Sequence, residues 1–365
     1  MRNLGPRTTS VLLLFALLLV MAKPASGAST SQVRSDADWI LAAQLPDGAI
    51  ANYVDRAAIW PYFANYAAVG LARAAEITHD SRYSDAAWRW LRWYQAHEEA
   101  SGFVTDYTVT EGSEVSTGTM DSTDAYAGTF LFAVRATWEA TRNRSQLQAL
   151  RPGIVGAVKA IKATQRHDGL TWAKPTWQMS YLMDESEAYA GLVAAASLAG
   201  TLEDSRLKKS ATSAAARLRA GTGRLWNQRL GAYDWALDAD GVRDPTNWSV
   251  LYPDALSQTW AVAFGLATGA RARELMRRFA AAQPNWDLPT ATAEFDSGPA
   301  PVGYWAVPAW AFARIGDPAL AGTALAQIST SALAVGRAWP FTAADAGELL
   351  AATGVGAADL LSRLG

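Results

Sequence analysis

Two short segments of the chain place acidic residues directly ahead of long apolar stretches. Residues 121–128 read DSTDAYAG, and residues 184–191, 63 positions later, read DESEAYAG. Two carboxyl groups in one site can divide acid–base work, because the protonated one donates a proton while the ionised one activates water or attacks the substrate. The repeat therefore marks candidates for carboxylate chemistry.

The composition leaves few other groups for catalysis. The 365 residues include no cysteine and only three histidines, which argues against a cysteine nucleophile and against a zinc site with nitrogen and sulfur ligands. Lys and Arg number 32 against 34 Asp and Glu, so the positive excess typical of nucleic-acid-binding proteins is missing. Hydrophobic residues make up 50% of the chain, enough for a large core. We expect no metal, no cofactor and no nucleic-acid partner.

Helical periodicity runs through the sequence, and two kinds of helix alternate. Amphipathic segments with one charged face cover residues 35–43, 82–99, 147–165, 206–219, 271–282 and 318–333. Segments that are small, apolar and aromatic nearly all round cover residues 60–76, 122–140, 185–199, 254–267, 302–315 and 343–352. The first kind is typical of helices with one side in water, and the second of helices buried on both sides. No segment shows a convincing strand pattern.

This alternation predicts six helical hairpins of about sixty residues each. If the inner helices close into a ring, they bury faces that an isolated hairpin would leave wet, so a single all-α domain covering residues 29–365 is expected. An open solenoid would show the same alternation.

The first 28 residues have the pattern of a secretory signal peptide. Arg2 and Arg7 precede an apolar run over residues 11–21, and small residues follow at 24–28. That run is shorter than the roughly 20 residues needed to span a bilayer. We expect a secreted, extracellular monomer without a membrane segment after cleavage.

The predicted architecture resembles the six-hairpin, or (α/α)6 toroid, glycosidases, which include glycoside hydrolase families 8, 15, 76, 88 and 105. The resemblance covers nearly the whole mature chain, and its motifs are the Asp-Gly turns at Asp47 and Asp168 and the carboxylates that open inner helices. It implies an active site in the cleft formed by the loops that lead into the inner helices. Family 8 enzymes open an early inner helix with Ser-Glu-Gly, whereas this chain has Trp-Pro-Tyr at residues 60–62.

Glycoside hydrolysis needs one protonated and one ionised carboxyl group, and their separation decides between inversion and retention. We assign the acid to Asp124, because it lies one turn inside its helix, and the base to Asp184, with Asp121 and Glu187 as further candidates. The alternative is that these residues only cap helices, since an acidic residue three positions after a helix start forms a capping box.

Aromatic side chains near the entries of the inner helices are the candidates for stacking against sugar rings. The predicted substrate-binding residues are Asp47, Trp60, Tyr62, Tyr126, Trp177, Tyr181, Tyr189, Asp254, Tyr304 and Trp305. The long polar loop over residues 101–120 is a candidate lid.

The sequence thus predicts a secreted glycoside hydrolase, inverting, that acts on an oligosaccharide or an extracellular or cell-wall polysaccharide. One alternative is a polysaccharide lyase on the same fold, in which Arg56 and Asn65 could neutralise a uronate. Another is a carbohydrate-binding protein that keeps the cleft without the chemistry. The three histidines fall at a helix end, on an outer helix and in a loop, which argues against the toroidal sugar epimerases.

Overall fold

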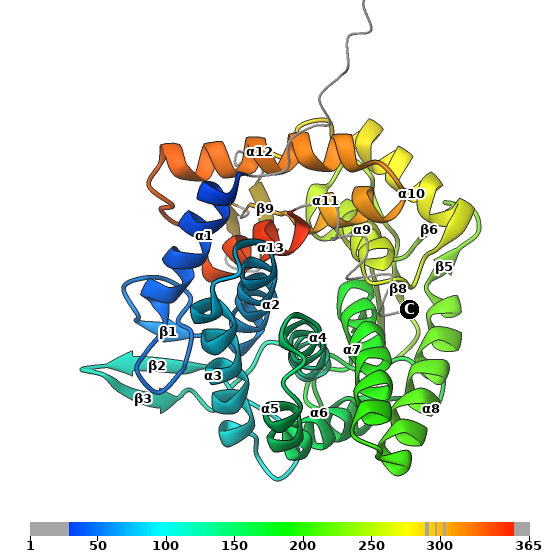
Figure 1. The fold of residues 1–365 in the computed structure, drawn as a ribbon. Helices are drawn as coiled ribbons and strands as arrows, with labels where there is room; N and C mark the ends of the chain where they lie inside the picture. The colour runs from blue at the N-terminus through cyan, green and yellow to red at the C-terminus, as the bar shows by residue number, and fades with distance from the viewer. Residues whose placement is uncertain (1–28, 289–291, 296–297, 302–303, 354–365) are drawn as a thin grey trace, which may run out of the picture.

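The computed structural model describes residues 29–288, 292–295, 298–301 and 304–353. Within these residues, six inner helices are surrounded by six outer ones (Figure 1). The inner helices are α2 (Pro61–Thr78), α4 (Thr123–Thr141), α7 (Leu182–Thr201), α9 (Leu256–Ala263), α11 (Val307–Arg314) and α13 (Ala343–Ala352). The outer helices are α1 (Thr30–Ala43), α3 (Ser81–His97), α6 (Arg151–Thr164), α8 (Ser205–Gly221), α10 (Gly269–Ala282) and α12 (Pro318–Ala334). A short helix, α5 (Arg144–Ala149), precedes α6.

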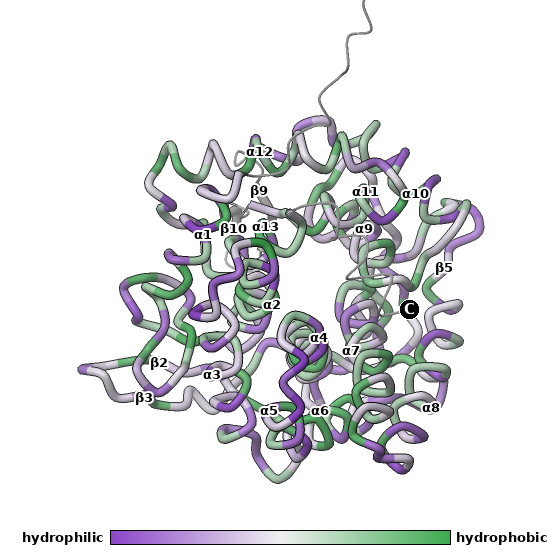
Figure 2. Tube along the Cα trace, viewed as in Figure 1, coloured by the Kyte–Doolittle hydropathy of each residue, from purple (hydrophilic) through white to green (hydrophobic). Residues whose placement is uncertain are grey.

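The inner helices form a closed ring. Along the chain α2 packs on α4, α4 on α7, α7 on α9 and α9 on α11, and the ring closes because α11 contacts α13 and α13 packs on α2. Each outer helix lies against the inner helices beside it, and Figure 2 shows hydrophilic stretches along the peripheral helix α8. The predicted (α/α)6 toroid is confirmed, and the open solenoid is excluded.

The repeated Ala-Tyr-Ala-Gly segment is a helix-packing motif. A Cβ atom on Gly128 would lie 2.7 Å from the carbonyl oxygen of Glu187 and 2.8 Å from the Cα of Ala188, and one on Gly191 would meet the backbone of Gly128 as closely. Because these distances leave no room for a side chain, α4 and α7 approach backbone to backbone. Gly70 and Gly347 bring α2 and α13 together in the same way.

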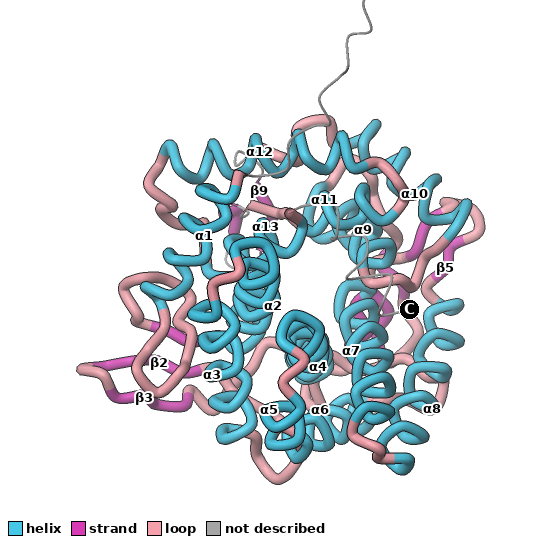
Figure 3. The backbone as a smooth tube through the Cα atoms, viewed as in Figure 1, coloured by secondary structure: helices cyan, strands magenta, loops and turns pink. Residues whose placement is uncertain are grey.

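Short antiparallel strands lie in the connections between the helices, as Figure 3 shows, and no pattern in the sequence indicated them. The strands are β1 (Ala58–Ile59), β2 (Tyr107–Thr110), β3 (Ser113–Ser116), β4 (Met179–Tyr181), β5 (Trp226–Asn227), β6 (Ala232–Tyr233), β7 (Ala236–Asp238), β8 (Arg243–Asp244), β9 (Thr292–Phe295) and β10 (Gly298–Pro301). They pair in the orders β1-β2-β3, β4-β7-β8, β5-β6 and β9-β10.

The expected lid over residues 101–120 contains the β2–β3 hairpin. Its two-residue turn holds Glu111 and Gly112 at φ angles of 52° and 78°, a left-handed pair that hairpin turns require. Glutamate is an uncommon residue at such a position, and the sequence therefore did not indicate a hairpin turn here. In the described residues no helix is long and apolar enough to cross a membrane. The predicted signal peptide, residues 1–28, lies outside the described residues.

Candidate active site

A cavity of about 520 Å³ opens where the inner helices begin. Each of the six hairpins contributes to its wall, through the first turns of α2, α4, α7 and α13 and through residues just ahead of α9 and α11. The lining residues are Trp60, Tyr62, Phe63, Asp106, Asp121, Ser122, Ala125, Tyr126, Met183, Asp184, Tyr252, Trp305, Trp339, Pro340, Thr342, Ala344, Asp345 and Glu348. The cavity therefore lies at the loops that enter the inner helices, where the active site was expected, and carboxyl groups line it.

Asp121 and Asp184 lie on one wall of this cavity, at the starts of α4 and α7. Asp121 is exposed to solvent, whereas Asp184 is half-buried. Burial raises the pKa of Asp184 well above its usual range, and the negative charges of Asp124 and Glu187 add to the effect, while a hydrogen bond from Ser122 opposes it. Asp184 is thus suited to hold a proton near neutral pH.

Asp124 does not line the cavity. Its side chain is 1% exposed, and both oxygens are bonded: Oδ1 accepts from Ser122 Oγ at 3.0 Å and from the Ala125 amide at 2.9 Å, and Oδ2 accepts from Thr171 Oγ1 at 2.5 Å. Desolvation raises its pKa to about 7. The side chain joins the start of α4 to the loop ahead of α7 and points away from the cavity wall.

Glu187 lies among the inner helices and, like Asp124, is absent from the cavity wall. Its Oε1 accepts hydrogen bonds from Tyr62 at 2.6 Å, from Tyr66, and from the Trp260 indole at 2.9 Å. Its Oε2 has no hydrogen-bond partner in the described residues. Burial raises the pKa of Glu187 to about 7, against the lowering effect of those three donors. Glu187 therefore holds Tyr62, which does line the cavity.

A second pair of carboxyl groups, which the sequence reasoning missed, lines the cavity from α13. Asp345 is a capping residue, because Oδ2 accepts from the Thr342 amide at 2.7 Å and from its hydroxyl at 2.6 Å, while Oδ1 accepts from the Tyr304 amide at 3.1 Å. Glu348 lies one turn further on and accepts from the Ala306 amide at 3.1 Å. The missed signal was the segment DAGE at 345–348, which repeats the Asp-x-x-Glu spacing of residues 184–187.

The pKa values of both carboxyl groups in the α13 pair are raised. Burial raises the pKa of Asp345 to about 7, and burial together with the charge of Asp345 raises the pKa of Glu348 well above its usual range. Because two buried carboxylates one turn apart repel each other, ionisation of one raises the pKa of the other, and the pair holds its protons more tightly than free carboxyl groups do. In the ring order, α13 lies three helices away from α7, so this pair faces the Asp184 wall from the opposite side.

Aromatic rings make up much of the remaining wall. Of the predicted substrate-binding residues, Trp60, Tyr62, Tyr126 and Trp305 line the cavity, and Trp305 stacks on Tyr252 with ring centroids 5.4 Å apart. Trp339, at the cavity rim, is 66% exposed and was not foreseen.

The base of the β2–β3 hairpin also reaches the cavity. The Tyr126 hydroxyl donates to Asp106 Oδ1 at 2.8 Å, and burial raises the pKa of Asp106 to about 6. Asp106 was missed because nothing in the polar loop distinguishes it.

Four predicted substrate-binding residues do not line the cavity. Asp47 is exposed in the turn after α1, where it accepts from the Ala49 amide. Tyr189 accepts from Arg219 of α8 at 2.7 Å, and Asp254 accepts from the Asn247 amide at 2.7 Å. The Tyr304 ring packs edge-on against Phe341. Each of these four side chains thus makes its contact with neighbouring residues of the protein, away from the cavity wall.

Trp177 and Tyr181 also lie outside the cavity wall, in the segment that leads into α7.

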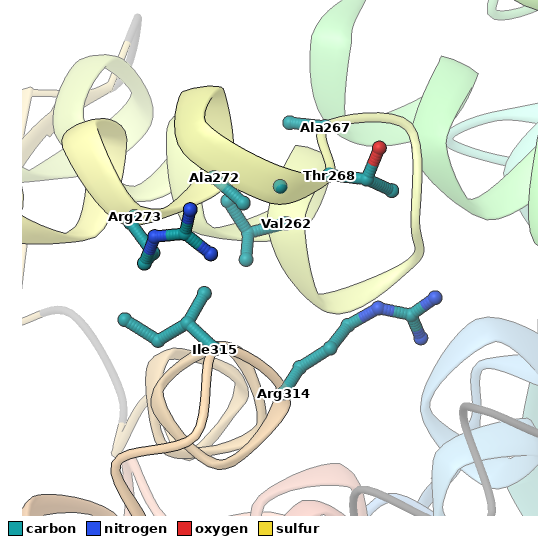
Figure 4. A pocket seen from close by; sticks show the side chains of 8 residues that line it. Val262, Ala267, Thr268, Ala272, Arg273, Arg314 and Ile315 are labelled. Atoms are coloured by element: carbon teal, nitrogen blue, oxygen red, sulfur yellow. The ribbon is translucent and has the colours of Figure 1, made fainter.

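A smaller cavity of about 150 Å³ lies near the ends of α9 and α11 and the start of α10 (Figure 4). Arg273 and Arg314 line it, together with Val262, Ala267, Thr268, Gly269, Ala272 and Ile315. It contains no carboxyl group and sits at the opposite ends of the inner helices from the larger cavity, so it lacks the groups for acid–base chemistry.

Comparison with solved structures gives matches over nearly the whole chain. A glycosidase, one variant of which was solved in complex with glucose, matches with a TM-score of 0.63 and 18% identity, covering 91% of this chain and 96% of its own. A GH63 mannosylglycerate hydrolase from Thermus thermophilus in complex with glucose matches with a TM-score of 0.63 and 12% identity, over 88% and 99% of the two chains. The chain has the fold of these glycosidases. No protein-family model and no curated protein matches it in sequence.

Proposed function

We propose that the protein is a secreted glycoside hydrolase that cleaves an oligosaccharide or polysaccharide with Asp184 as proton donor. The observation that carries the proposal is the placement of carboxyl groups on opposite walls of one aromatic-lined cavity, Asp184 on α7 and the Asp345–Glu348 pair on α13. This arrangement matches the two-carboxylate requirement of glycoside hydrolysis. The shared fold with glycosidases supports it.

The roles follow from the electrostatics of the two walls. Asp184 keeps a proton near neutral pH because its pKa is raised, so it can protonate the oxygen of the leaving group. We assign the base that activates water to the α13 pair, because Asp345 accepts hydrogen bonds from three donors, which favour its ionised form, and Glu348 lies one turn deeper. This assignment replaces Asp124 as the acid and moves Asp184 from base to acid. Carboxyl groups on opposite walls leave room for a water molecule, which favours inversion.

The test is hydrolysis of a panel of nitrophenyl glycosides and oligosaccharides, with released reducing ends measured and the anomeric product followed by NMR. Asp184→Asn and Glu348→Gln should each lower kcat by about a hundredfold or more, the usual weight of a general acid or base. Asp240→Asn, in an exposed turn, is the matched control and should leave kcat unchanged.

If both cavity variants kept full activity, or if Asp124→Asn alone abolished it while leaving stability intact, the assignment would be overturned. Initial formation of the product with the retained anomeric configuration would refute inversion.

The lyase alternative is disfavoured by the positions of the two residues it needs. Asn65 is fully buried, where it donates to Thr129 Oγ1 at 3.0 Å and accepts from the Trp90 indole at 3.0 Å. Arg56 is exposed and donates to the Ala42 carbonyl at 3.0 Å. No basic side chain lines the described part of the cavity, so a uronate would lack a neutralising partner there. Unsaturated products in the same panel would reverse this conclusion.

A further inference from the structure

An exposed tryptophan stands just outside the cavity, on the α7 side. Trp177 is 51% exposed, in a tight turn closed by an antiparallel bridge between Lys174 and Trp177. Its indole N–H donates to the Tyr181 hydroxyl at 2.8 Å. Among the described residues only Trp177 and Trp339 expose large aromatic rings to this degree, and Trp339 belongs to the cavity rim. An indole whose polar atom is already satisfied presents only its apolar faces to water.

Two further rings hold this tryptophan in place. Tyr181 stacks on Trp235 with ring centroids 6.0 Å apart and an interplanar angle of 7°. Strand pairing fixes the stack, because Tyr181 of β4 lies opposite Ala236 of β7, the residue after Trp235. We call Trp177, Tyr181 and Trp235 the aromatic platform. The hydrogen bond and the ring stack position these side chains for a ligand, so that binding costs little side-chain entropy.

The aromatic platform adjoins the wall that carries the proposed proton donor. Tyr181 is three residues ahead of Asp184, and burial raises the pKa of the Tyr181 hydroxyl, with the charges of Asp184 and Asp121 adding to the effect. The Lys174 ammonium donates to the Met120 carbonyl at 2.9 Å, which ties the Trp177 turn to the residue before Asp121. The platform therefore continues the Asp184 wall outward from the cavity.

We propose that the aromatic platform binds a sugar ring on the leaving-group side of the bond that is cleaved. This inference rests on the proposed function, because the acid donates its proton to the leaving group and whatever extends past Asp184 is therefore the leaving group. The face of the Trp177 ring would stack on the apolar face of that sugar. The substrate class is thus a saccharide whose leaving group contains at least two sugar units, one inside the cavity and one on the platform.

The experiment compares Trp177→Ala, Trp177→Phe and Trp339→Ala on substrates of increasing length. The panel first identifies the sugar that the enzyme releases. The value of kcat/KM is then measured on the nitrophenyl glycoside of that sugar and on its di-, tri- and tetrasaccharides. Trp177→Ala should lower kcat/KM about tenfold on the tri- and tetrasaccharide, a stacking contribution of ordinary size, and leave the nitrophenyl glycoside unchanged. Trp177→Phe should retain most of the activity, because it keeps an aromatic face. Trp339→Ala, at the cavity rim, should lower kcat/KM on every substrate.

An equal loss on all lengths, or no loss on any, would overturn the proposal. A binding measurement separates its failure from the failure of the proposed function. If the wild-type chain hydrolyses nothing in the panel, the proposed function fails. The platform is then tested by adding the tetrasaccharides to the Asp184→Asn variant and measuring binding from the change in its intrinsic tryptophan fluorescence. Binding that weakens about tenfold when Trp177→Ala is added supports the platform. Absence of binding, or binding that Trp177→Ala leaves unchanged, refutes it.

Discussion

The buried Glu187 carboxyl group should make the protein less stable as the pH rises. Its pKa in the folded chain is about 7, against an ordinary value of 4.5, because burial outweighs the hydrogen bonds from Tyr62, Tyr66 and Trp260. The folded state therefore binds more protons than the unfolded state between these two values. Stability from this group is present below the unfolded pKa and is lost as the pH rises towards 7, and above 7 the loss stays constant.

The size of the effect follows from the pKa difference. A shift of about 2.5 units corresponds to about 3 kcal/mol, of which about 2.5 kcal/mol falls between pH 5 and pH 8.5. Glu187→Gln removes the titration and keeps the neutral shape, with Oε1 still placed to accept the three donors. The variant should therefore gain about 2.5 kcal/mol relative to the wild type on going from pH 5 to pH 8.5.

Urea denaturation at pH 5 and pH 8.5 measures this difference, with the slope of the transition checked for constancy. Other buried carboxyl groups also titrate in this range and are present in both proteins, so the comparison measures the titration of Glu187 together with its effect on the pKa of neighbours such as Asp184. A difference between wild type and variant that is the same at both pH values would refute the reasoning, because it would mean that Glu187 does not change its charge within this window.

Three other expectations follow from the structure. The value of kcat/KM should fall as the pH rises through the raised pKa of Asp184, since the acid must be protonated to act, and a pH–rate profile checks this alkaline limb. Gly191→Ala should lower stability by about 1 to 3 kcal/mol through overpacking against α4, whereas Gly200→Ala on the same helix, with no atom near its Cβ position, should be neutral or stabilising in the same urea measurement. Asp36→Asn, which leaves Arg337 without its buried ion-pair partner at 2.5 Å, should lower the free energy of unfolding by about 3 kcal/mol at pH 7, measurable by the midpoint of thermal unfolding.

The architecture was predictable because each helix has a recognisable periodic pattern in its own residues. Apolar and amphipathic periods alternate along the sequence, and this alternation follows from which helices touch water. The strands were not predictable, because β1, β5, β6 and β8 are only two residues long and carry no measurable period.

The site was predictable only in part, because residue type does not tell which way a helix is rotated. Asp121 and Asp124 sit in one motif, yet Asp121 reaches the cavity and Asp124 points to Thr171. In the second motif, Asp184 lines the cavity, whereas Glu187 is buried and accepts a hydrogen bond from Tyr62. Such choices depend on packing between helices that are distant in sequence, which periodicity does not record.

Asp345 and Glu348 were missed for a related reason. Their helix is short and lies near the end of the chain, and only ring closure brings it opposite α7. Thr342 and Asp345 form a capping box in the structure, and a capping box in the sequence gives no hint that its acidic residue also faces a cavity.

The closed ring also constrains the order in which this chain can become functional. The contact between Arg337 and Asp36 joins residues 301 positions apart, and the two carboxylate walls belong to hairpins three places apart in the chain. Helices form quickly from local contacts, but such distant contacts must wait until the intervening chain has been ordered. The cavity therefore does not exist during most of synthesis, and it is completed only when the final hairpin docks between α11 and α2. A ribosome-bound or truncated chain that lacks residues 318–353 would carry the Asp184 wall without the wall that opposes it.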